Sequence, residues 1–318
     1  MYEEFYNLTE RPFTLTPNPR YVFYSARYRE ATDELHYGIE RKEGFMLLTG
    51  WPGTGKTTLC RDLLEKLDPS KYKSALIFNP FLNGVEVLQA LLTEFGLDYP
   101  AGASRNDLLN ALNRFLINQL AAGRTCVAVF DEAQHMSTEF LEQIRVLSNL
   151  ETAEEKLIQI VLVGQPELIS RIKMPGMAQL NQRVSVRSRL THLDPEETRR
   201  YIYHRLEVAG AHGRVTFTSR AISKIHRASQ GIPRRINTIC DHALLAGYVD
   251  RTRELGLPQV KHAISSLHGE DVDAPLPRRS RARTLAIALS AAVAILAGAG
   301  AIFAYMSGQL VIPQLALP

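Results

Sequence analysis

The sequence has few cysteines, and they follow no regular spacing. Cys60, Cys126 and Cys240 are scattered along 318 residues, and no Cys-x-x-Cys pair occurs. A disulfide framework or a cysteine zinc site needs paired or closely spaced cysteines, so the sequence argues against both and favours a reducing compartment. The nine histidines also lack the spacing of metal ligands, so we expect them to be solvated or hydrogen-bonded locally.

The sequence also has little excess charge. The net charge is +4, and much of it comes from one short cluster, Arg278, Arg279, Arg281 and Arg283. The remainder is nearly neutral, so composition gives no reason to expect a nucleic-acid partner. The length is sufficient for a nucleotide-binding core plus a second small domain.

Charged residues are absent from one long segment near the carboxyl terminus. Residues 284–306 carry no charge, and as a helix they would extend roughly 34 Å, enough to cross a bilayer core. A buried helix of a soluble protein is the alternative. The arginine cluster just before this segment predicts that the amino-terminal side stays in the cytoplasm, with residues 307–318 as a short tail on the far side. The amino terminus is acidic and has no apolar signal region.

Apolar runs and helical patterns alternate through the first two thirds of the chain, which predicts an α/β fold with a parallel sheet covered by helices on both faces. The expected strands are 45–49, 74–78, 126–130, 158–163 and 184–190, with helices at 56–67, 85–95, 105–122, 138–150 and 167–172. The strand signals stop after residue 193, and the patterns at 196–209, 219–229, 233–248 and 259–267 predict a small all-helical domain. We therefore divide the chain into a lead-in (1–42), an α/β core (43–193), a helical domain (194–267), a basic linker (268–283), a transmembrane helix (284–306) and a tail (307–318).

The most informative motif lies between the first strand and the following helix. Residues 50–57 read Gly-x-x-x-x-Gly-Lys-Thr, the phosphate-binding P-loop, in the strand–loop–helix context that the motif requires. Lys56 is expected to contact the β- and γ-phosphates of ATP, and Thr57 to bind Mg²⁺. The predicted nucleotide-binding residues are Gly50, Trp51, Pro52, Gly53, Thr54, Gly55, Lys56, Thr57, Thr58 and Asp131.

A second motif ends the third expected strand. The apolar run from Cys126 to Phe130 is followed by Asp131 and Glu132, which is a Walker B pattern. We expect Asp131 to bind Mg²⁺ through water, and Glu132 to act as the general base toward the attacking water. A carboxylate capping a helix amino terminus is the alternative interpretation of such a pair.

Two further positions complete the predicted site. Gln165 ends the fourth strand, where a polar side chain can contact the γ-phosphate or the water. Arg234 and Arg235 begin a helix of the second domain, and an arginine there can reach the nucleotide. We favour Arg234, while Arg235 remains open.

At this point the chain resembles the AAA+ ATPases over residues 44–267, with Gln165 as sensor 1 and Arg234 as sensor 2. The resemblance implies a strand order of 5-1-4-3-2, a helical lid, and a homo-oligomer in which an arginine of one subunit completes its neighbour's site. Arg183 is our candidate for that arginine, with Arg187 and Arg189 as alternatives.

More narrowly, the chain resembles the ExeA/GspA family of general-secretion ATPases. The residues that carry this resemblance are 5–13, 17–20, 45–50, 131–134, 164–168 and 231–237. It implies a single-pass inner-membrane protein with a cytoplasmic ATPase domain, which drives or regulates assembly of secretion, pilus or polysaccharide machinery together with an envelope partner. Long family members carry a peptidoglycan-binding domain beyond the span, whereas this sequence stops 12 residues after residue 306.

A DNA-associated ATPase that resembles transposition regulators is the alternative function. It would keep the same ATPase core but predicts a basic groove or DNA-binding domain and no membrane span. Basic residues of the helical domain are interspersed with acidic ones, which favours a solvated surface.

Overall fold

The computed structural model describes residues 2–16, 18–153 and 155–268. The described residues up to Leu267 belong to one compact unit. The expected membrane helix at 284–306, the basic linker after residue 268 and the tail lie outside the described residues. No described helix is long and apolar enough to cross a membrane.

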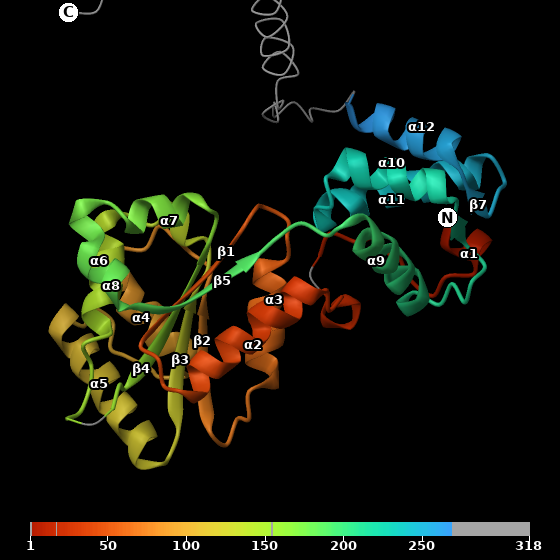
Figure 1. Ribbon diagram of the computed structural model, residues 1–318. Helices are drawn as coiled ribbons and strands as arrows, with labels where there is room; N and C mark the ends of the chain where they lie inside the picture. Colours follow the sequence, from red (N-terminus) through yellow and green to blue (C-terminus); the bar gives the residue numbers. More distant parts are fainter. Residues whose placement is uncertain (1, 17, 154, 269–318) are drawn as a thin grey trace, which may run out of the picture. The chain divides into compact units, whose positions relative to one another are not determined.

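A five-stranded parallel sheet forms the centre of the α/β core (Figure 1). Its strands are β1 (Phe45–Gly50), β2 (Tyr72–Ile77), β3 (Thr125–Phe130), β4 (Ile158–Gly164) and β5 (Val184–Leu190). Their order across the sheet is β5-β1-β4-β3-β2, which confirms the predicted 5-1-4-3-2 order. Every residue of β1 and β4 is buried, whereas exposed and buried residues mix along the edge strands β2 and β5.

Helices cover both faces of this sheet. They are α2 (Ala26–Glu40), α3 (Lys56–Lys66), α4 (Gly84–Glu94), α5 (Arg105–Ala121), α6 (Thr138–Leu147), α7 (Glu167–Ile172) and α8 (Ala178–Arg183). Short 3-10 turns occur at Pro19–Tyr21, Ala133–His135 and Pro175–Met177. Polar caps fix several helix starts: the side chain of Asn83 accepts from the first turn of α4, and that of Ser104 from the first turn of α5.

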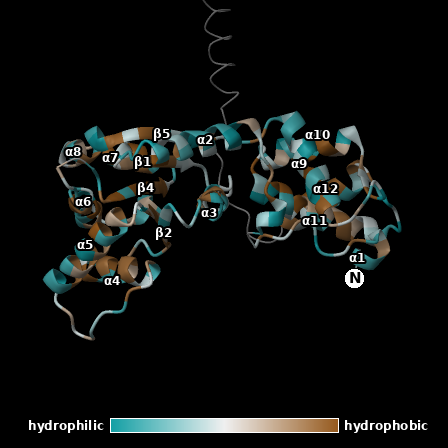
Figure 2. Cartoon of the chain, turned by 90° about the horizontal axis from the view of Figure 1, so that it is seen from below, coloured by the Kyte–Doolittle hydropathy of each residue, from teal (hydrophilic) through white to brown (hydrophobic). Residues whose placement is uncertain are grey.

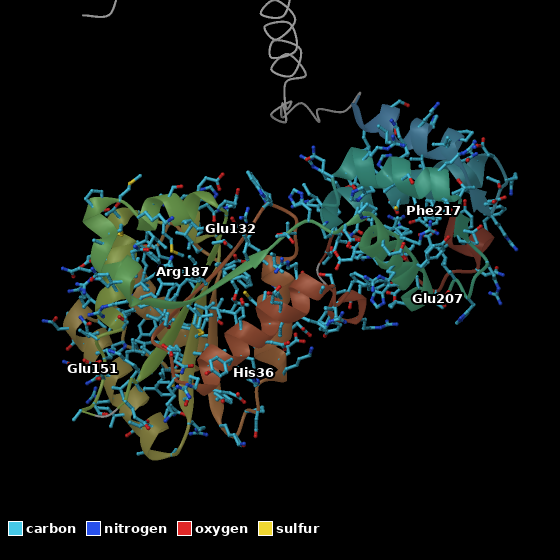
Figure 3. All side chains as sticks on the ribbon, in the orientation of Figure 1. His36, Glu132, Glu151, Arg187, Glu207 and Phe217 are labelled. Carbon is cyan, nitrogen blue, oxygen red and sulfur yellow. The ribbon has the colours of Figure 1, made fainter. Side chains whose placement is uncertain are left out.

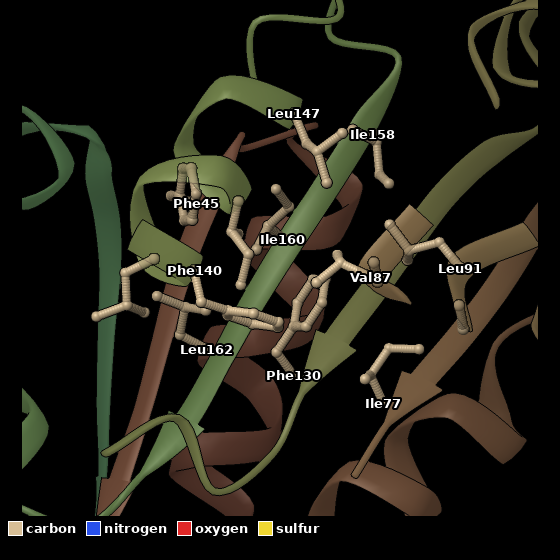
Figure 4. Packing of buried hydrophobic residues seen from close by; sticks show 14 of the residues in the cluster. Phe45, Ile77, Val87, Leu91, Phe130, Phe140, Leu147, Ile158, Ile160 and Leu162 are labelled. Atoms are coloured by element: carbon tan, nitrogen blue, oxygen red, sulfur yellow. The ribbon is translucent and has the colours of Figure 1, made fainter. Parts of the chain in front are cut away.

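Alternate residues of each central strand point to opposite faces, so the sheet has two apolar layers. Phe45 and Leu47 of β1 pack with α4, α5 and α6, whereas Met46 and Leu48 pack with α2 and α3. Figure 4 shows the first layer, in which the rings of Phe130 and Phe140 meet edge to face with centroids 6.3 Å apart. In Figure 2 the hydrophobic colour accordingly concentrates along the strands and the inner sides of the helices.

The second domain contains α9 (Pro195–Val208), α10 (Ser219–Ser229), α11 (Pro233–Val249) and α12 (Leu257–His268). It is not all-helical as predicted, because β6 (Thr216–Phe217) and β7 (Glu254–Leu255) pair in parallel. These strands have two residues each, too short to produce a recognisable period-two pattern. Their main-chain hydrogen bonds link the loop before α10 to the loop before α12.

The beginning of the chain is part of this helical domain. Helix α1 (Tyr2–Tyr6) places Tyr2 and Tyr6 in the same apolar cluster as α9, α10 and α11. The Tyr6 hydroxyl donates to the carbonyl of Leu244, 3.0 Å away. The guanidinium of Arg205 donates to the carbonyl of Pro12. The lead-in thus packs on the helices nearly 200 residues later in sequence.

Candidate nucleotide site

The phosphate-binding loop connects β1 to α3. Gly53 and Gly55 adopt φ of +78° and +99°, a left-handed backbone that strongly favours glycine. The hydroxyl of Thr54 donates to the carbonyl of Trp51 at 2.8 Å and tightens the turn. These glycines let the loop fold back so that α3 begins at Lys56 with its free N–H groups toward the loop.

The Lys56 ammonium is held beneath this loop. It donates to the carbonyls of Gly50 and Trp51 at 2.9 and 3.3 Å, and only 6% of the residue is exposed. Burial lowers the pKa of Lys56, while the nearby carboxylates of Glu132 and Asp131 oppose that change. The cation is therefore fixed next to the space that the loop encloses.

Thr57 and Asp131 come together from different motifs. The Thr57 hydroxyl donates to Asp131 Oδ2 at 2.5 Å, and the main-chain N–H of Glu132 donates to Asp131 Oδ1 at 2.8 Å. Asp131 is 1% exposed, and burial raises the pKa of its carboxyl. Two oxygen ligands thus lie side by side, as a hard cation such as Mg²⁺ requires.

Glu132 and Gln165 follow the neighbouring strands β3 and β4 and lie at the same end of the sheet, because these strands pair in parallel. Glu132 has a left-handed backbone with φ of 53°. A cavity of about 300 Å³ is lined by both residues, by the loop from Pro52 to Thr58, and by Arg234. The structure therefore brings the predicted base, sensor and phosphate loop to one cavity. Gly50 and Trp51 contribute to it only indirectly, through the carbonyls that hold Lys56.

The first turn of α11 brings Arg234 to this cavity. Its main-chain N–H donates to the carbonyl of Gly53 at 3.2 Å. Arg235 does not line the cavity. Its charge instead helps to lower the pKa of His192, for which burial is the larger cause. Of the two arginines left open by the sequence, Arg234 is the one placed beside the nucleotide loop.

The three candidate trans arginines do not line the cavity of their own chain. Arg183 donates to the side chains of Ser148 and Asn149 at 2.8 and 2.5 Å. It directly precedes the amino end of β5, whereas the P-loop follows the carboxyl end of β1. Because the two strands are parallel, Arg183 and the P-loop lie at opposite ends of the sheet's strands. Figure 3 labels Glu132 toward the carboxyl ends of the strands and Glu151 toward their amino ends. The pKa of Glu151 is lowered mainly by its hydrogen bond with Lys156 and less by the charge of Arg183.

Arg187 and Arg189 occupy the exposed side of the edge strand β5. Together with Lys173 they line a second groove of about 430 Å³. Arg187, labelled in Figure 3, donates to the carbonyl and the side chain of Asn181 at 2.8 and 2.9 Å. All three candidates are thus on surfaces separate from their own nucleotide cavity, as an arginine acting on a neighbour must be.

The sequence did not predict the wall of the cavity that faces the phosphate loop. Residues of the lead-in between Thr14 and Tyr28 line it, together with Tyr201, Arg205 and Asn237. Asn237 Oδ1 accepts from the Tyr201 hydroxyl at 2.8 Å, and Arg205 donates to the same hydroxyl at 3.0 Å. No sequence signal joins residues so far apart. The side chain of Gln134 was also missed, although it follows Glu132 by two positions.

Comparison with known proteins agrees with this geometry. A family model described as an AAA domain matches residues 39–172. General secretion pathway protein A of Aeromonas hydrophila is 45% identical over 248 residues, which cover 78% of this chain. The match covers 45% of that protein, so this chain spans less than half the length of its curated relative.

Solved structures show the same fold at low sequence identity. The Aeropyrum pernix ORC2 protein, solved as ADPNP-ADP complexes, aligns with a TM-score of 0.63 and 19% identity over 80% of this chain and 71% of that one. The Thermotoga maritima RuvB Holliday junction branch migration motor aligns with a TM-score of 0.52 and 18% identity over 81% of this chain and 72% of that one. Together with the P-loop and the 5-1-4-3-2 sheet, these matches show that the chain contains an AAA domain and is similar over most of its length to general secretion pathway protein A.

Proposed function

We propose that this protein hydrolyses ATP and uses the cycle to drive or regulate assembly of cell-envelope secretion, pilus or polysaccharide machinery. The observation that carries the ATPase proposal is the convergence of Lys56, Glu132 and Arg234 on one cavity. A fixed cation, a carboxylate and a lid arginine around a phosphate loop are the groups that phosphoryl transfer to water needs.

Each residue has a distinct part in the proposed reaction. Lys56 and the loop N–H groups bind the β- and γ-phosphates and stabilise the negative charge on the transferred γ-phosphoryl group and on the departing ADP. Glu132 orients the attacking water by a hydrogen bond and accepts its proton as the water oxygen bonds to the γ-phosphorus, while the bond from that phosphorus to the β–γ bridging oxygen breaks and ADP leaves. Gln165 and Arg234 contact the γ-phosphate from the strand and lid sides.

The residues present fit a magnesium ion. Thr57 Oγ1 and Asp131 Oδ2 are 2.5 Å apart, and both are oxygen ligands of the kind Mg²⁺ prefers. Thr57 would bind the ion directly and Asp131 through water. When bound, Mg²⁺ neutralises negative charge on the β- and γ-phosphates.

The proposed place of action is the inner membrane, with the ATPase domain in the cytoplasm. Residues 284–306 are uncharged and follow an arginine cluster, which fits one span with the amino-terminal side inside. The similarity to general secretion pathway protein A supports a secretion-related partner. We propose a homo-oligomer in which Arg183 of one subunit acts on the ATP of the next. We do not expect a nucleic-acid partner.

Two variants test the chemistry. Lys56→Ala is expected to abolish tight ATP binding, because it removes the cation at the phosphates. Glu132→Gln is expected to bind ATP normally and release no phosphate, because the loop and the magnesium ligands are intact while the base is lost. Equilibrium nucleotide binding and phosphate release measure both. Turnover near the unmodified rate in Glu132→Gln would remove Glu132 from this role.

A further inference from the structure

The side chain of Gln134 connects the ends of two neighbouring strands at the cavity. Its Nε2 donates to Glu132 Oε2 at 2.6 Å, and its Oε1 accepts from the main-chain N–H of Gln165 at 2.9 Å. One amide group therefore bonds both to the proposed base, which follows β3, and to the residue that follows β4.

The orientation of this amide follows from its partners. The N–H of Gln165 can only donate, so it must face the amide oxygen of Gln134. The nitrogen of the amide is then directed at Glu132 Oε2, which accepts from it. A hydrogen bond to a carboxylate is charge-assisted and among the stronger ones in proteins. Of the side chains of this length, glutamine alone supplies both the donor and the acceptor.

The surroundings hold Gln134 in this place. The Arg171 guanidinium, from α7, donates to the Gln134 carbonyl at 2.6 Å. A Cβ at Gly164 would lie 2.9 Å from Gln134 Oε1, so glycine at that position leaves room for the amide. Among the described residues, Glu132 Oε1 has no hydrogen-bond partner, while His135 Nε2 lies 4.0 Å from Oε2. One carboxylate oxygen is thus fixed and the other is left for water.

We propose that Gln134 is a positioning residue for ATP hydrolysis, which holds the Glu132 carboxylate so that its free oxygen faces the attacking water. The inference rests on the proposed role of Glu132 as the general base. Gln134 itself touches neither nucleotide nor water in this proposal. Its loss should therefore lower kcat and leave ATP affinity unchanged.

The test uses two substitutions of similar size in the full-length protein. Gln134→Met removes both hydrogen bonds, and Gln134→Glu keeps the acceptor for Gln165 but replaces the donor with a second carboxylate. We expect kcat for phosphate release to fall about tenfold or more in each, by analogy with residues that orient metal ligands, at unchanged Kd for ATP. The unchanged Kd also shows that each variant has folded.

A matched control comes from β4. Gln159 is fully buried, and its amide donates to the carbonyl of Ile39 at 3.0 Å. Gln159→Met also removes a buried amide but lies at the other end of the strand, so it should reduce stability without reducing kcat. If kcat falls equally in Gln159→Met and Gln134→Met, the loss is general destabilisation and the proposal is wrong.

A double variant tests whether Gln134 acts through Glu132. In a Glu132→Gln background, Gln134→Met should cause no further loss of the single-turnover rate, because the group that it positions is already gone. A further loss as large as in the unmodified protein overturns the proposal, as does an unchanged or raised kcat in the single variants. If Glu132→Gln turns over normally, the proposed base is wrong; if it is inactive while Gln134→Met is fully active, only the positioning role fails.

Discussion

The main-chain N–H of Arg234 donates to the carbonyl oxygen of Gly53, and this bond joins the lid helix to the phosphate-binding loop. The backbones approach so closely that a Cβ on Gly53 would lie 2.7 Å from Cβ of Arg234. The arginine side chain therefore starts directly above the loop that wraps the phosphates. Through this hydrogen bond, a movement of the loop on nucleotide binding would displace the first turn of α11.

Arg234→Ala and Arg235→Ala should therefore differ. We expect Arg234→Ala to reduce ATP hydrolysis by about tenfold or more, because it removes a cation beside the γ-phosphate. Arg235→Ala should hydrolyse ATP at nearly the normal rate, since Arg235 does not line the cavity. Steady-state phosphate release with both purified variants measures the difference. The reverse ranking would assign the lid sensor to Arg235.

Arg183→Ala should bind ATP normally and hydrolyse it slowly if the arginine acts on a neighbouring subunit. Arginines in this role contribute roughly 10³-fold or more in other P-loop proteins. Mixing Arg183→Ala with Lys56→Ala subunits should restore part of the activity, since each supplies what the other lacks. Its bonds to Ser148 and Asn149 offer a purely structural role instead, and verified mixed oligomers without any recovery of activity would favour that role. Arg187→Ala and Arg189→Ala are the comparison variants.

Because His204 is partly buried, the free energy of unfolding should decrease as the pH falls into the mildly acidic range. Burial lowers its pKa below the usual 6.5, with a hydrogen bond to the Val22 carbonyl opposing. Its Nε2 is buried and has no hydrogen-bond partner within the part of the chain that the structure describes. The unfolded chain binds a proton as the pH falls through 6.5 while the folded chain does not. Stability is therefore present above that pH and is lost below it, until the folded His204 also titrates.

The measurement is Tm from about pH 7.5 to about pH 5.5, the interval in which this proton is taken up. His204→Phe keeps a ring against Phe23, 5.7 Å away in the native contact, and should show a shallower decline than the unmodified protein. The exposed His212→Gln should keep the original slope. Equal slopes in all three proteins would show that His204 does not contribute. His192, whose pKa is also lowered by burial, accounts for part of the remaining slope.

Deletion of residues 284–318 should yield a soluble protein that still binds ATP and no longer pellets with membranes. The physical reason is that the uncharged segment is the proposed span, while the described residues that line the nucleotide cavity all lie before residue 238. Fractionation of the full-length and shortened proteins, with a high-salt wash, checks this. Release of the full-length protein by salt alone would refute the span and favour the DNA-associated alternative.

The sheet was predictable because each central strand is a short apolar run bounded by turn residues, and the P-loop identifies which strand comes first. The strand order then came from the family resemblance, and the pairings of β1 with β4 and β5 confirm it. The pattern of Asp131 and Glu132 indicated chemistry because it follows an apolar strand in a chain that also has a P-loop, with Lys56 lying 75 residues before Asp131. The catalytic and binding roles assigned to the site residues from the sequence remain predictions.

Other features depend on contacts that no local pattern encodes. Gln134 belongs to a segment that carries the family resemblance, but its role could not be predicted from the sequence. Only its hydrogen bonds to Glu132 and to the N–H of Gln165 indicate one. The β6–β7 pair is too short to have a period. In the lead-in wall of the cavity, Asn237 Nδ2 donates to the carbonyl of Thr14 at 3.3 Å. These two residues lie far apart in the sequence.

The packing of α1 on α11 sets the order in which the chain can mature on the ribosome. The hydroxyl of Tyr2 donates to Asp241, and Tyr6 bonds to the carbonyls of Leu244 and Thr252. Tyr2 and Tyr6 are synthesised well over 200 residues before these partners, so their native hydrogen bonds form only after α11 has been made. Meanwhile the α/β core can complete its sheet once β5 has emerged. A nascent chain would thus pass through a stage with a formed phosphate loop and an open nucleotide cavity, and ATP retention would report the moment at which the lead-in packs on α9 and α11.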